Sequence, residues 1–309
     1  MEALPSPQQL RYLLALDEFQ HFGRAAQACS VTQSTLSAGI LALERALDAS
    51  ILDRSAGRHV VFTPLGRELV FRAGEAMASL AAFADAAAAA RAPLPARLRL
   101  GLIPTIGPFL LPRMMAALRR ELPDLRLYLR EDVTDRLVEG LQQGRLDVVL
   151  MALPCDCGPA ETMLVARDEF VAALPPGHSL ARRERVPAAA LAAEPLLLME
   201  DGHCLRDQAL AVCGMAGRRE RAGEEPFAAT SLHTLVQMVA SGLGVTLLPR
   251  IAVEAGIAEG TGIELRPLAG AGAWRTLALG WRPNAPRAPA FRALGDVLRG
   301  VAGAAAVLA

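Results

Sequence analysis

A long stretch with helical periodicity divides this chain into two unequal parts. Thr63 and Pro64 provide an N-cap and a first-turn proline, and an alanine-rich helical pattern continues without a break to about Arg91. A helix of that length spans about 42 Å and carries apolar side chains along one side, so it is not expected to stand alone. We therefore predict a linker and dimerisation helix over residues 63–92.

The part before the linker has the order of a winged helix-turn-helix. Apolar residues at three- and four-residue spacing predict two short helices between Gln8 and Ala28. A turn at Ser30 then leads into a third helix that continues to Leu47, and residues 54–63 follow as a predicted β-hairpin wing. This order predicts a DNA-binding domain over residues 1–62.

The N-terminal end of the third helix is the candidate surface for reading DNA. Short hydrogen-bonding side chains at such a position can reach base edges in a major groove, and backbone amides can meet phosphates. Charge supports this only locally, because residues 1–62 contain five Arg and six acidic residues. The candidate DNA-binding residues are Gln33, Ser34, Thr35 and Ser37 in the helix, with Arg54 and Arg58 in the wing.

The part after the linker alternates strands and helices, which predicts an α/β regulatory domain over residues 93–309. A double crossover, as in periplasmic binding proteins, divides it into subdomain I (93–166 and 271–309) and subdomain II (167–270). The predicted strands are 97–102, 125–131, 147–152, 195–199, 245–249 and 277–281, and the predicted helices are 107–121, 135–143 and one after Pro289.

Composition restricts the class of protein. With 52% hydrophobic and 21% charged residues the chain is expected to be a soluble globular protein, and it has neither a spanning apolar run nor an export signal, so we expect it in the cytoplasm. An odd number of cysteines in such a chain makes a structural disulfide framework improbable, which leaves reactive, metal-binding or buried thiols. The cysteines are Cys29, Cys155, Cys157, Cys204 and Cys213.

Three strand-to-helix joints are candidates for a binding site, because ligands in open α/β sheets sit beyond the carboxyl ends of strands. They are residues 104–107, 133–134 and 201–204. The hydroxyls of Thr105 and Thr134 belong to this set, although either can simply cap a helix.

Cys204 is predicted in the first turn of a helix that Asp201 caps, beside His203 and Arg206, where the helix dipole and cationic neighbours favour a thiolate. Cys213 ends the same helix. Along one helix the two residues are about 13 Å apart, whereas a disulfide needs Cα atoms within about 7 Å. The two thiols can therefore join only if the helix unwinds.

Several motifs resemble LysR-type transcription regulators, and the strings around the two cysteines resemble the peroxide-sensing members of that family. Ser34 departs from the proline that is common there, and Gly39 weakens its helix by about 1 kcal/mol. The strings are Ala25-Ala26, Val31 to Ser37, Leu52-Asp53-Arg54, Phe62 to Gly66, Leu102 to Pro108, Asp201 to Ala209 with Cys213, and Ala229 to Leu232.

The resemblance implies a DNA-binding regulator rather than an enzyme, with no cofactor or metal. It implies that hydrogen peroxide oxidises Cys204, the peroxidatic residue, and that Cys213 resolves the product to an intramolecular disulfide. It also implies a homotetramer (a dimer of dimers), contact with RNA polymerase, and re-reduction by a glutaredoxin- or thioredoxin-type system. The implied peroxide-binding residues are Thr105, Thr134 and His203, and the supporting residues are Arg206, Asp207 and Arg275.

Some features remain open at this level. Ala228 and His233 stand where the family commonly has Arg and Glu, so contacts near the switch segment can differ. Cys155 and Cys157 form a C-x-C that allows a soft-metal site, a redox pair or a loop without a special role, and two thiolates cannot complete a zinc site. The competing functions are a LysR-type regulator that binds a small organic inducer and a thiol peroxidase.

Overall fold

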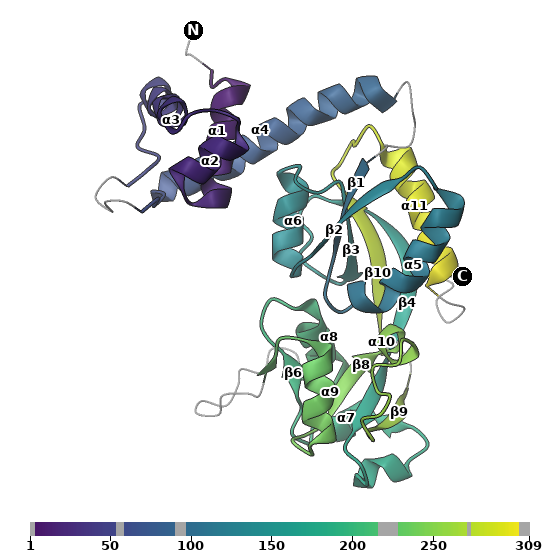
Figure 1. The fold of residues 1–309 in the computed structure, drawn as a ribbon. Coiled ribbons are helices and arrows are strands. Elements are labelled where there is room, and N and C mark those ends of the chain that lie inside the picture. Colours follow the sequence, from purple (N-terminus) through teal and green to yellow (C-terminus); the bar gives the residue numbers. More distant parts are fainter. Residues whose placement is uncertain (1–3, 54–58, 90–96, 216–227, 271–272, 303–309) are drawn as a thin grey trace. The chain divides into compact units, whose positions relative to one another are not determined.

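A computed structural model describes residues 4–53, 59–89, 97–215, 228–270 and 273–302 (Figure 1). Two compact units form, one from Met1–Arg91 with Gly140–Arg145 and the other from Ala92–Glu139 with Leu146–Ala309. Within the described ranges, no helix combines the length and the apolar character that crossing a membrane requires.

The first unit is helical, and polar side chains cap its helices. Thr32 accepts a hydrogen bond from the Thr35 backbone N–H, and Thr63 accepts one from the Gly66 N–H at 2.9 Å, as the N-cap prediction at Thr63 requires. Its helices are α1 (Pro7–Phe19), α2 (Phe22–Ala28), α3 (Gln33–Leu47) and α4 (Pro64–Ala89).

The core of the first unit lies between α1, α2 and α3 and includes the fully buried Leu16, Leu36 and Leu43. Glu44 is buried beside them because its carboxylate accepts hydrogen bonds from the backbone N–H groups of Ile51 (2.9 Å) and Leu52 (3.2 Å). An antiparallel bridge joins Leu52 to Phe62 at the base of the predicted wing. Residues 54–58, with Arg54 and Arg58, lie outside the described residues.

Gly39 has a packing role that outweighs its low helix propensity. A Cβ atom at this position would lie 2.6 Å from Cδ2 and 2.8 Å from Cε2 of the buried Tyr12 ring. The missing side chain therefore lets α1 approach α3 closely.

The second unit is built on a mixed sheet with the strand order β2-β1-β3-β10-β4-β9-β5, and β8 also pairs with β4. β1 runs parallel to β2 and β3, whereas β10 runs antiparallel to β3 and β4. The strands are β1 (Arg97–Leu102), β2 (Arg126–Glu131), β3 (Val148–Leu153), β4 (Glu161–Leu174), β5 (Val186–Pro187), β6 (Leu198–Met199), β7 (Ala228–Ala229), β8 (Thr246–Pro249), β9 (Glu264–Ala269) and β10 (Trp274–Trp281).

The long strand β4 joins the two lobes of this unit (Figure 1). Its first part pairs with β10 as far as Glu169, and its last part, from Phe170, pairs with β8 and β9. The sequence predicts a new subdomain near Asp168, and the structure shows that the chain passes there as a continuous strand. The helices are α5 (Gly107–Glu121), α6 (Thr134–Gln142), α7 (Ala188–Leu191), α8 (Cys204–Val212), α9 (Leu232–Ala240), α10 (Arg250–Glu254) and α11 (Ala288–Val301), with a 3-10 helix at Ser179–Arg182.

The predicted strands and helices recur with small shifts. The helix predicted at 107–121 is α5, with the same bounds, whereas the strand predicted at 195–199 shortens to β6. The strand predicted at 277–281 starts three residues earlier in β10, which brings Arg275 into the sheet.

Candidate functional site

The N-terminal end of α3 presents the predicted DNA-reading side chains. Gln33, Ser34 and Thr35 are exposed, and Ser37 is half-buried. The Thr32 hydroxyl lies 2.9 Å from the Ser34 hydroxyl and 2.7 Å from the Thr35 hydroxyl. This turn therefore offers short, fixed hydrogen-bonding groups at the start of a helix, which is the arrangement that enters a major groove.

Cys204 is the first residue of α8, at the edge of the second lobe. The Thr134 hydroxyl, at the start of α6 in the first lobe, lies 2.8 Å from the Cys204 Sγ. The Cys204 side chain is half-buried, so a small oxidant can reach it. The Thr134 side chain therefore contacts a thiol 70 residues further along the chain, a role that helix capping does not account for.

The surroundings of Cys204 differ in two ways from the sequence prediction. Asp201 does not cap α8, since His203 is the N-cap residue and makes no capping bond through its side chain. The Asp201 carboxylate instead forms an ion pair of 2.9 Å with Arg206, whose Nη1 also donates to the Met199 carbonyl oxygen. The capping prediction for Asp201 is wrong, because a cation one turn away takes up its carboxylate.

The second difference concerns charge at His203. Burial lowers the pKa of His203 below its ordinary value, against the opposing effect of Glu200. Burial therefore favours the neutral imidazole of His203 over the cationic neighbour that the sequence suggests. Cys204 lies at the amino-terminal end of α8, which carries a partial positive charge, whereas the guanidinium of Arg206 pairs with Asp201. Asp207 is exposed.

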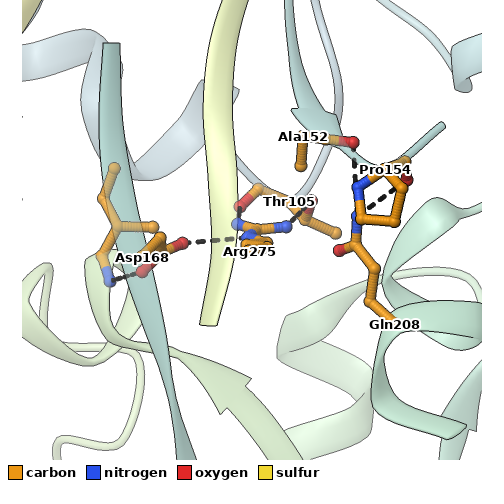
Figure 2. Close-up of polar contacts among 7 residues, drawn as sticks. Thr105, Ala152, Pro154, Asp168, Gln208 and Arg275 are labelled. Atoms are coloured by element: carbon orange, nitrogen blue, oxygen red, sulfur yellow. Dashed lines mark hydrogen bonds and ion pairs between the residues drawn. The ribbon is translucent and has the colours of Figure 1, made fainter. Parts of the chain in front are cut away.

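Thr105 belongs to a second polar cluster, centred on Arg275 in β10 (Figure 2). Arg275 is 1% exposed and donates to the Thr105 hydroxyl at 2.8 Å and to the Thr105 carbonyl oxygen at 2.9 Å. Its Nε donates to Asp168 at 2.9 Å, and the other oxygen of Asp168 accepts from the Ile251 N–H at 3.0 Å. The buried ion pair between Arg275 and Asp168 has its hydrogen bonds satisfied. It therefore connects the strand-to-helix joint at Thr105 to both lobes.

Cys213 is the C-cap residue of α8 and is 5% exposed. Burial raises the pKa of the Cys213 thiol to about 11, so the thiol stays protonated at neutral pH and is a poor nucleophile in this conformation. Cys204 and Cys213 are free thiols at opposite ends of one helix, about 13 Å apart along its axis. As the sequence predicts, the two thiols are too far apart to form a disulfide while α8 is helical.

Gln208 is a buried residue of this region that the sequence prediction missed. It lies one turn after Cys204 on α8, and its Nε2 donates to the carbonyl oxygens of Ala152 and Pro154 (Figure 2). Its Oε1 is buried without a hydrogen-bond partner among the residues that the structure describes. A glutamine four residues after a candidate reactive cysteine is the only signal that the sequence offers for it.

The remaining cysteines fall into two groups. Cys155 and Cys157 form a disulfide, with Cα atoms 5.5 Å apart, so the expectation of no disulfide framework does not extend to this pair. The two cysteines lie in one loop, with only Asp156 between them. Cys29 packs against the core of the first unit, and burial raises the pKa of its thiol.

The two departures from the family pattern have different surroundings. The His233 ring, in the first turn of α9, stacks on Phe109 of α5, with centroids 5.7 Å apart. Ala228 is exposed in β7 and pairs with Leu198. Where the family commonly has an acidic side chain, this chain therefore has His233, whose ring makes a contact between the lobes.

Two family models match the chain. The model of a bacterial regulatory helix-turn-helix protein of the lysR family matches residues 7–67, and that of the LysR substrate binding domain matches residues 91–303.

Similar proteins match over almost the whole length. A probable hydrogen peroxide-inducible genes activator of Mycobacterium avium is 42% identical over 294 residues, which cover 95% of this chain and 93% of the relative. The DNA-binding transcriptional dual regulator OxyR of Escherichia coli is 39% identical over 290 residues, which cover 94% and 93%.

Solved structures agree with this similarity. Full-length OxyR of Pseudomonas aeruginosa, with a cysteine replaced by aspartate, superposes with a TM-score of 0.76 at 34% identity and covers 96% of this chain and 98% of that one. A hydrogen-peroxide-bound cysteine-to-serine mutant of Corynebacterium glutamicum OxyR gives 0.63 at 31% identity, with 97% and 94% covered.

Proposed function

The chain belongs to the LysR family of bacterial transcription regulators, and from this premise we propose that it activates transcription in response to hydrogen peroxide, sensed at Cys204. As a member of that family it is a DNA-binding regulator and not an enzyme, which removes the thiol peroxidase from the alternatives. The predicted family and the two-lobed α/β fold class are confirmed.

The observation that carries the proposal is the contact of 2.8 Å between the Thr134 hydroxyl and the Cys204 sulfur at the start of α8. The thiolate is the form of a cysteine that attacks peroxide, and the Thr134 hydroxyl fixes the position of the Cys204 sulfur. The thiolate attacks one peroxide oxygen, the O–O bond breaks, and the departing hydroxide takes up a proton to leave as water. Cys204 becomes a sulfenic acid.

Cys213 completes the reaction after α8 unwinds. Its sulfur attacks the sulfenic sulfur, the S–O bond breaks, and a second water leaves as the disulfide forms. Because the thiol is buried and the helix holds it too far away, this step requires a different conformation of residues 204–213. In this proposal Thr105, His203 and Arg275 arrange the polar surroundings of the peroxide, and the new conformation is the signal.

The exposed apolar side of α4 bears on how the chain assembles. Leu65, Leu80 and Phe83 are exposed on α4, and Phe83 is 81% exposed, so this helix has an apolar surface for a second copy to cover. We infer a dimer through α4 and a homotetramer on promoter DNA in the cytoplasm. The oxidised protein would contact RNA polymerase, and a glutaredoxin- or thioredoxin-type dithiol would restore the thiols.

The experiment that tests the function is promoter footprinting with reduced protein before and after hydrogen peroxide. We expect peroxide to change the footprint of the unaltered chain and of Cys29→Ser, and to leave that of Cys204→Ser unchanged. If Cys204→Ser responds to peroxide as fully as the unaltered chain does, Cys204 is not the sensor. If only a small organic metabolite changes the footprint, the function is that of the inducer-binding alternative.

A further inference from the structure

A second sulfur pair lies outside the site described above. The Cys155–Cys157 disulfide follows β3, and both residues are half-buried. The Sδ of the buried Met151 lies 3.5 Å from the Cys155 Sγ. The disulfide thus has one side against the sheet and another that a thiol reagent can reach.

This disulfide contributes little to stability. A disulfide stabilises a fold mainly by closing a loop in the unfolded chain, and its effect becomes smaller as that loop becomes shorter. Only Asp156 separates the two cysteines, so the bond restrains very little of the unfolded chain. Accessible disulfides are the ones that exchange readily with thiols. The pair is therefore better suited to redox exchange than to holding the fold together.

Gln208 links this segment to α8. Its Nε2 donates to the carbonyl oxygens of Ala152 (3.2 Å) and Pro154 (3.3 Å), and Pro154 directly precedes Cys155. Gln208 is 6% exposed, and its Oε1 lacks a partner within the described part of the chain. Both hydrogen bonds of the Gln208 side chain are made to the segment that precedes the disulfide. A shift of that segment would therefore break contacts of α8.

We propose that Cys155 and Cys157 are a second thiol–disulfide couple, which exchanges with a dithiol reductant and whose state α8 detects through Gln208. One thiolate of the reductant attacks a sulfur of the pair, the S–S bond breaks, and a mixed disulfide forms. The second thiol of the reductant then releases the protein sulfur, so the pair gains two electrons and two protons while the reductant becomes a disulfide. Opening the small ring frees the Pro154 carbonyl to move away from Gln208.

The test uses the full chain with Cys204→Ser and Cys213→Ser, so its outcome does not depend on peroxide sensing. The protein is equilibrated in glutathione and dithiothreitol buffers of graded oxidised-to-reduced ratio. Alkylation and peptide mass spectrometry follow Cys155 and Cys157, and deuterium exchange follows residues 204–212. We expect a reversible two-electron transition and, in the reduced form, about tenfold faster exchange in α8, as the loss of buried hydrogen bonds implies.

Two further variants test the route through Gln208. In Gln208→Leu, which keeps the side-chain volume, the redox transition should persist while the difference in α8 exchange disappears. Ala211→Ser, at an exposed position of the same helix, should keep that difference. A pair that stays in one state across all buffers, or a transition that leaves α8 exchange unchanged in the parent protein, overturns the proposal. A difference that survives in Gln208→Leu overturns the role of that side chain.

Discussion

The hydroxyl of Thr134 contacts the Cys204 sulfur directly, so it should affect the rate at which Cys204 reacts with peroxide. We predict that Thr134→Val, which removes the hydroxyl and keeps the shape, slows oxidation of Cys204 by peroxide about tenfold or more, as the loss of a hydrogen bond to a charged group implies. Stopped-flow measurement under excess peroxide gives the rate. Thr134→Ser keeps the hydroxyl and should keep most of the rate, and equal rates in the two variants would remove Thr134 from the mechanism.

Asp168 supplies the counter-charge of the buried Arg275 and so offsets the cost of burying that cation. Asp168→Asn leaves that cation without its counter-charge, and we predict a loss of about 3–5 kcal/mol in the free energy of unfolding. The neighbouring Glu169 pairs with Arg250 at 2.8 Å but is exposed, so Glu169→Gln should cost less than about 1 kcal/mol. Denaturant titration of both variants measures the contrast, and similar losses would contradict the account.

Two helix glycines should respond to alanine with opposite signs. At Gly39 a Cβ atom would overlap the Tyr12 ring, which costs about 1–3 kcal/mol and outweighs a propensity gain of about 1 kcal/mol. At Gly300, in the last turn of α11, a Cβ atom would have no neighbour within 4 Å. We predict that Gly39→Ala lowers the thermal unfolding midpoint and that Gly300→Ala raises it or leaves it unchanged. A rise for Gly39→Ala would show that Tyr12 gives way.

At the level of elements, periodicity and capping signals were sufficient to predict α3, α5 and the start of α4, because each depends on residues close in sequence. The roles of individual polar side chains were harder to predict. From the sequence, Thr105 and Thr134 can simply cap helices. In the structure the Thr105 hydroxyl contacts Arg275, 170 residues further on, and the Thr134 hydroxyl contacts Cys204, 70 residues further on. Asp201 failed as a cap for the opposite reason, since its partner Arg206 is local and competes with the helix amides.

The whole second unit explains why these residues meet. Thr105 and Thr134 lie in the first lobe, Cys204 lies in the second, and Asp168 and Arg275 lie on β4 and β10, where the chain passes between them. Oxidation of Cys204 would therefore alter a contact between the two lobes. The predicted boundaries at 62/63, 92/93, 166/167 and 270/271 remain predictions, because sequence pattern places elements better than it divides a continuous strand.

The central claim is that oxidation joins the two ends of α8, and peptide mapping of the oxidised chain tests it most directly. Reduced protein is treated with hydrogen peroxide, alkylated and digested without reductant. We predict that Cys204 and Cys213 appear in one cross-linked peptide pair, and that Cys204→Ser leaves Cys213 alkylated as a control. Full alkylation of both residues after peroxide treatment, with the DNA footprint nonetheless changed, would contradict the claim.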